Sequence, residues 1–166
     1  MSNTAFTTSS TEQKAEVTLL SFSAKKNYDQ VIRDLERQLG VLDQEKALAA
    51  KENFESAVKA MEGSLGLMII SSLRMDMLVP SLAASQAHAR QYLIGNPLIA
   101  SKMTQHNALA ALYAPIRLLV YTQDEKTIIS YDRPSSSFAR LNNEAINETA
   151  HALDEKFKEL VTTALG

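Results

Sequence analysis

Two short apolar runs near residue 120 restrict the fold more than any other feature of the chain. Ile116–Thr122 (IRLLVYT) and Thr127–Asp132 (TIISYD) are rich in β-branched and large apolar residues, and a polar loop, QDEK, separates them. Such a pair is typical of two antiparallel strands joined in a hairpin. The sequence therefore predicts a sheet with antiparallel pairing in this half of the chain.

Three further runs are predicted to be strands: Glu16–Phe22, Leu67–Leu73 and Arg90–Ile94. Each is short and mostly apolar, and the last is followed by the turn-forming tripeptide Gly95–Pro97.

Helical periodicity fills the intervals between the predicted strands. Apolar residues recur every three or four positions at 28–39, at 43–62 and along a long helix at 146–165, with shorter helices predicted after Pro97 and Asn107. The order is β-α-α-β-β-α-β-β-α, which predicts an α+β domain. We expect two layers, a mostly antiparallel sheet covered by helices, with an inserted helix at about 43–62.

Composition limits the class of protein. The chain has 166 residues, a formal net charge of −2 and no Cys. Its length fits one domain, which we expect at 15–166 after a disordered tail at 1–14. The charge gives no basic face for nucleic acid, and the absence of Cys excludes disulfides and Cys-held metals. With no secretory signal and no uninterrupted membrane span, the sequence predicts a soluble, cytoplasmic protein without nucleic-acid or membrane partners.

The second half of the chain contains four ordered blocks: YLIGNPL at 92–98, NALAAL at 107–112, PIRLLVY at 115–121 and ISYDRP at 129–134. Together they resemble the domain of unknown function 302 family. By motif, the match covers about residues 66–134, and the flanking first strand, first helix and last helix agree by position. The resemblance implies a compact two-layer α+β fold similar to that of small bacterial proteins that tend to form homodimers, and whose biochemical role is largely unassigned.

The chain departs from the family pattern in two places. The helix expected at 43–62 intervenes where many relatives pass directly from the first helix to a Gly-led strand. Relatives also often carry an acidic residue followed by His after that strand, whereas the matching positions here look like Arg74 and Met75. If that His does chemistry in some relatives, this chain has lost it.

No catalytic or metal-binding motif is present in the sequence. The three His residues show none of the spacings that hold a metal, and neither a nucleophile elbow nor a Gly-rich phosphate loop occurs. The sequence therefore names no catalytic residue, no metal ligand and no cofactor.

One candidate polar cluster follows from the resemblance and from the predicted strand ends, where loops often carry binding groups. Its members are Asn96, His106, Arg117, Tyr131 and Asp132. A purely structural interpretation is also open: Asn96 would form a turn, Asp132 would cap a strand end, and Arg117 would pair with Asp132 as an ion pair.

Two functions follow from these observations. The sequence favours a non-enzymatic binding or interaction protein that works as a homodimer, with the thin Ala-rich face at 47–61 as one possible contact. The alternative is a small-molecule-binding protein or enzyme whose polar site lies around Asn96 and Arg117. The ligand's identity is open in both.

Overall fold

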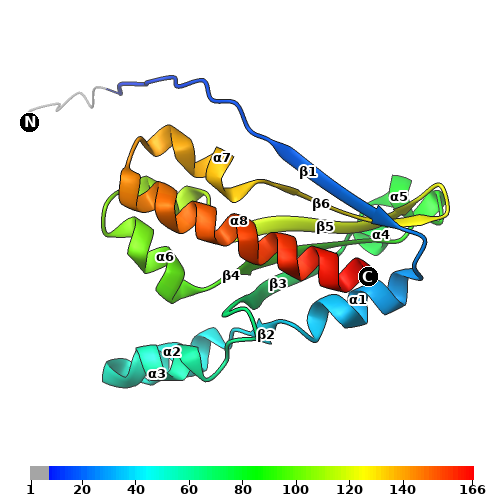
Figure 1. Cartoon of the computed structure of the whole chain (residues 1–166), viewed down its shortest axis with the longest axis horizontal. Helices are drawn as coiled ribbons and strands as arrows, with labels where there is room; N and C mark the ends of the chain where they lie inside the picture. The colour runs from blue at the N-terminus through cyan, green and yellow to red at the C-terminus, as the bar shows by residue number, and fades with distance from the viewer. Residues whose placement is uncertain (1–7) are drawn as a thin grey trace, which may run out of the picture.

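The computed structural model describes residues 8–166 and shows one open sheet of six strands. The strand order is β1-β6-β5-β4-β3-β2 (Figure 1). All neighbours are antiparallel except β2 and β3. The strands are β1 (Leu19–Ala24), β2 (Gly40–Val41), β3 (Met68–Arg74), β4 (Ala89–Gly95), β5 (Ile116–Gln123) and β6 (Lys126–Asp132).

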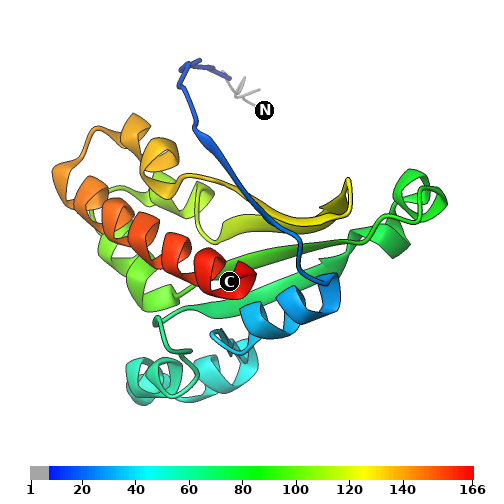
Figure 2. The same cartoon turned by 45° about the vertical axis from the view of Figure 1, so that its right-hand side comes forward.

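Helices α1, α6 and α8 lie together on one face of this sheet (Figures 1 and 2). The helices are α1 (Tyr28–Glu36), α2 (Gln44–Ala49), α3 (Phe54–Lys59), α4 (Met75–Leu78), α5 (Pro80–Ala84), α6 (Pro97–Thr104), α7 (Pro134–Phe138) and α8 (Glu144–Leu165), with 3-10 turns η1 (Lys51–Asn53), η2 (Ala108–Leu112) and η3 (Ala139–Leu141). The expected two-layer α+β fold with a mostly antiparallel sheet is confirmed.

Burial alternates along the central strands because only one face of the sheet is covered. On β5, Leu118 and Val120 are fully buried against the helices, whereas Arg117, which points the other way, is exposed. The long helix α8 supplies most of the covering surface. Its buried residues recur every three or four positions: Ile146, Ala150, Leu153, Phe157, Leu160, Val161 and Ala164.

The predicted hairpin is confirmed, with a tighter turn than the sequence suggested. Gln123 and Lys126 pair as the last residues of β5 and β6, so the loop is reduced to Asp124 and Glu125. Both have positive φ, 49° and 58°. This is the backbone of the two-residue turn that matches the natural twist of a hairpin.

The other predicted strands are also present. Those at 67–73 and 90–94 agree with β3 and β4 to within one residue at each end. The first strand is displaced: it was expected at 16–22, but β1 begins at Leu19, because its partner β6 ends at Asp132 opposite that residue. Only residues 8–14 of the predicted tail lie within the described part of the chain, and they are exposed and outside any helix or strand.

The single helix expected at 43–62 is wrong in detail. The segment forms two short helices, α2 and α3, separated by η1 with Lys51 at φ 49°, and the two lie side by side (Figure 1). Its Ala-rich face is used within the chain, since Ala47 and Val58 are buried with Met68 of β3 in a small second core. The periodicity identified the buried residues of this segment, but it could not show that the chain reverses direction between α2 and α3.

A projecting segment joins β3 to β4. It contains α4 and α5 and extends beyond the end of the sheet (Figure 2). Within residues 8–166, no helix combines the length and apolar character needed to cross a lipid bilayer.

We expect Phe157→Ala to lower the free energy of unfolding by about 3–5 kcal/mol, the usual cost of emptying a buried aromatic site. Phe157 is fully buried, and its ring centroid lies 5.4 Å from that of Tyr131. Urea unfolding followed by circular dichroism measures the change. Leu112→Ala is the control, because Leu112 is 72% exposed and its loss should cost less than about 0.5 kcal/mol. A cost below about 1 kcal/mol for Phe157→Ala would show that α8 does not form the core.

Candidate functional site

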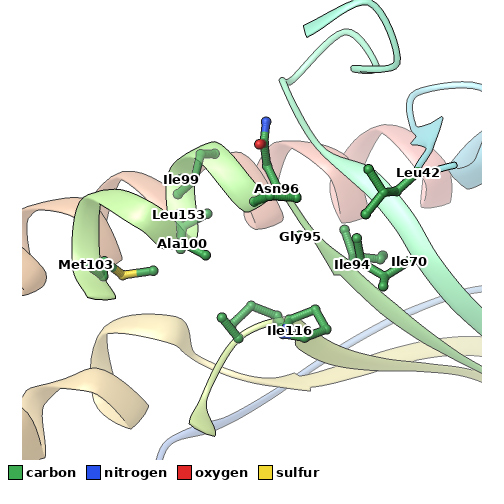
Figure 3. A pocket seen from close by; sticks show the side chains of 13 residues that line it. Leu42, Ile70, Ile94, Gly95, Asn96, Ile99, Ala100, Met103, Ile116 and Leu153 are labelled. Atoms are coloured by element: carbon green, nitrogen blue, oxygen red, sulfur yellow. The ribbon is translucent and has the colours of Figure 1, made fainter. Parts of the chain in front are cut away.

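A mainly apolar pocket lies where β4 ends and α6 begins (Figure 3). Its volume is about 180 Å³. Walls come from the β4–α6 junction, from α6, from the start of β5 and from Leu153 of α8; among the residues lining it are Ile94, Gly95, Ile99, Ala100, Met103 and Ile116.

Asn96 forms one wall of this pocket and is nearly buried, with 6% of its surface exposed. Its Oδ1 accepts a hydrogen bond from the Leu98 backbone N–H (2.8 Å), which caps α6. Its Nδ2 donates to Oε1 of Glu62 (2.6 Å) and to the Gly66 carbonyl (2.9 Å). Both amide donors are therefore used within the chain, and Figure 3 shows the amide pointing away from the pocket.

Gly95 and Pro97, on either side of Asn96, each suit the local backbone for a different structural reason. A Cβ at position 95 would lie 3.2 Å from Cβ of Pro115, so the absence of a side chain lets the two segments approach closely. Pro97 occupies the first turn of α6, where its missing N–H costs no helical hydrogen bond. The Gly-Asn-Pro motif thus builds a rigid corner beside the pocket.

A pocket with this lining recognises shape and apolar surface rather than charge. Cavities of about 150 Å³ lined by aliphatic side chains accept a ring the size of benzene. The pocket therefore has room for a small apolar molecule, or for the apolar part of a larger one.

Arg117 and Asp132 both line a second hollow, also of about 180 Å³. Each is next along its strand to one of the paired residues Leu118 and Tyr131, whose side chains are buried against the helices, so both point to the other face of the sheet. They share this hollow with Tyr113 and Ser137. None of the ion pairs between described residues joins them. Pro115 and Ile116 line both hollows, which places this one next to the apolar pocket.

The other two residues of the predicted cluster lie elsewhere. Tyr131 faces the helices, so it is on the opposite side of the sheet from Arg117, and burial raises its pKa to about 12. His106 is exposed after α6, with Nε2 3.4 Å from Nε2 of Gln105. The structure thus brings Arg117 and Asp132 together, puts Asn96 near them, and separates Tyr131 from them.

A charged cluster that the sequence analysis missed lies at the other end of β3 and β4. Asp76 is nearly buried and receives two hydrogen bonds from Arg74, from Nε (2.9 Å) and Nη2 (3.0 Å). Nδ1 of His88 lies 3.7 Å from the same carboxylate, and the His88 ring stacks on Tyr28 with centroids 4.8 Å apart. The Arg74 guanidinium lowers the pKa of Asp76, with smaller contributions from the Ala89 backbone and His88.

A second ion pair lies beside the first. Glu36, at the end of α1, accepts hydrogen bonds from Arg90 Nη1 (3.0 Å) and from the Tyr92 hydroxyl (2.7 Å). Burial raises the pKa of Tyr28 to about 12 and also raises that of Tyr92. No sequence motif links these residues, because α1, β3 and β4 meet only in the folded chain. An acidic group and a His do meet after β3, but as Asp76 and His88 rather than at positions 74 and 75.

We expect Asn96→Ala to destabilise the protein by about 2–3 kcal/mol. It removes the α6 cap and leaves Glu62 and the Gly66 carbonyl without their donor. Asn107→Ala is the matched control. Among the described residues, the Asn107 side chain bonds to the Leu109 N–H alone and so caps η2, and its loss should cost about 1 kcal/mol. Thermal and urea unfolding compare them. Equal costs would mean that the two extra hydrogen bonds of Asn96 contribute nothing.

We expect Arg74→Ala to raise the pKa of Asp76 toward its ordinary value, because the largest cause of the lowered pKa is removed. Since the folded-state pKa lies below the unfolded one, the pair stabilises the protein above the unfolded pKa, and this contribution is lost as the pH falls through the folded pKa. The variant should therefore show a weaker loss of stability in acid. NMR titration of the Asp76 carboxyl group measures the pKa directly. Arg37→Ala, at the exposed C-cap of α1, is the control and should leave the pKa of Asp76 unchanged.

Comparison with known proteins shows which solved structure and which family resemble this chain. A crystal structure of an uncharacterized conserved DUF302 protein from Bacillus stearothermophilus superimposes with a TM-score of 0.61 at 15% identity, covering 88% of this chain and 97% of that one. No curated protein matches the chain. The family model for the domain of unknown function DUF302 matches residues 45–164, which include β3 to β6, α6 and most of α8 but not β1, α1 and β2. The chain belongs to the DUF302 family.

Proposed function

We propose that this chain is a non-enzymatic, homodimeric binding protein that holds a small apolar molecule, or the apolar end of a larger one, in the pocket between β4 and α6. The observation that carries this proposal is the pocket itself, which is hollow, apolar and walled by residues of the folded core. Most ligand sites are concave and apolar in this way.

The geometry favours binding over chemistry at this pocket. Asn96 is the polar side chain in its wall, and its amide donors are already used by Glu62 and Gly66. General acid–base or nucleophilic catalysis needs a titratable group within hydrogen-bond reach of the ligand. The walls supply apolar contact instead, and each buried methylene contributes about 0.8 kcal/mol to the affinity.

Arg117 and Asp132 support a second candidate, a small-molecule-binding protein or enzyme with a polar site. Their hollow adjoins the apolar pocket across Pro115 and Ile116. A ligand whose apolar part fills the pocket could then place a polar group beside Arg117. Arg117→Ala distinguishes the candidates: weaker ligand binding by a folded variant supports the polar site, whereas unchanged binding supports the purely apolar one.

We expect toluene to bind at the pocket and to shift the NMR signals of the Met103, Ala100 and Ile116 methyl groups. Ala100→Phe should weaken this binding at least about 10-fold, because the added ring occupies the space. Ala108→Phe is the matched control, since Ala108 is exposed on η2 and does not line the pocket. An Ala100→Phe variant that folds and binds toluene with unchanged affinity would refute the pocket, as would wild-type protein whose pocket methyl signals do not move.

A further inference from the structure

Strand β1 is an uncovered edge of the sheet. Within residues 8–166 it pairs only with β6. The Arg133 N–H donates to the Thr18 carbonyl (2.8 Å), and bonded pairs alternate along an antiparallel ladder. Leu20, Phe22 and Ala24 therefore direct their backbone groups toward β6. The N–H and C=O groups of Leu19, Ser21 and Ser23 point outward, away from the sheet.

This edge lacks the features that normally prevent strands from pairing with other chains. Its sequence, LLSFSA, contains no charge and no Pro, and all six residues are in register with β6 without a bulge. The opposite edge of the sheet is protected from such pairing. There β2 covers the start of β3, a bulge interrupts β3 between Ile69 and Ser71, and the charged residue Arg74 ends the strand.

Apolar side chains are exposed on one face of β1 and partly exposed on the other. Leu19 is 65% exposed on the face away from the helices. On the helix face, Leu20 and Phe22 line a hollow of about 340 Å³ between β1 and α8. This hollow also carries charges of both signs, from Arg133 and Lys158 and from Asp154 and Glu155. A strand added to this edge would cover apolar surface as well as satisfy backbone groups.

We propose that β1 pairs antiparallel with β1 of a second copy of this chain, about a two-fold axis at Ser21, so that two sheets become one. The proposal rests on the homodimer part of the proposed function and names its contact. A second copy fits because an uncharged strand brings no like charges opposite one another when it pairs with itself. The two-fold axis also places the large Leu19 opposite the small Ser23 of the second copy, and Ser21 opposite itself.

The test uses opposite charges at the two-fold position. Ser21 is exposed, and within the described residues its side chain bonds to Ser130 alone, so the strand should tolerate both Ser21→Lys and Ser21→Asp. Light scattering after size exclusion should show wild-type protein at twice 18.3 kDa. Each variant alone should dimerise at least about 10-fold more weakly, because like charges then face each other, and a mixture of the two should recover the dimer. Ser72→Lys, on the other edge of the sheet, is the control and should remain dimeric.

The outcomes separate this inference from the proposed function. A dimer that persists unchanged in both Ser21 variants refutes the β1 contact but leaves the homodimer intact. Monomeric wild-type protein refutes both, while toluene binding still decides the ligand part. Amide hydrogen exchange gives a second measurement that needs no variant: Ser21 and Ser23 should be protected in the dimer and should lose that protection on dilution. Fast exchange of both amides at concentrations where the protein is dimeric overturns the inference.

Discussion

The burial of one sheet face against α8 is the constraint on which the rest of the structure depends. The apolar stripe of this helix covers Tyr131, Leu118 and their neighbours, while the opposite face carries Arg117 and Asp132 in solvent. A sheet covered on one side alternates buried and more exposed residues along each central strand, and β5 and β6 do so. One helical layer also cannot reach every edge, which leaves β1 open and leaves the strand ends to shorter elements.

The apolar pocket follows from that arrangement. At the end of β4 the chain leaves the sheet and turns into α6, and Asn96 fixes the turn by bonding to three separate backbone or side-chain groups. A corner that is held so firmly cannot collapse onto the core, so the space between α6 and the start of β5 stays hollow. Asn96 thus acts on any ligand indirectly, through the shape of the pocket.

At the other end of β3 and β4, ion pairs rather than an apolar hollow lie where α1 meets the sheet. Arg74 with Asp76, and Arg90 with Glu36, neutralise each other where α1 meets β3 and β4. Paired and hydrogen-bonded, these charges can be partly buried at a low energetic cost. The two ends of β4 therefore differ in character, an apolar hollow at one and a polar network at the other.

The sequence by itself determined the strands of the second half, the hairpin, the buried stripe of α8 and the family, because local periodicity and ordered motifs carry that information directly. It also singled out Asn96. Only the tertiary structure decided that Tyr131 faces away from Arg117, that the segment at 43–62 folds back on itself, and that Asp76 meets His88. Those facts depend on strand register and on contacts between residues far apart in the chain, which no local pattern encodes.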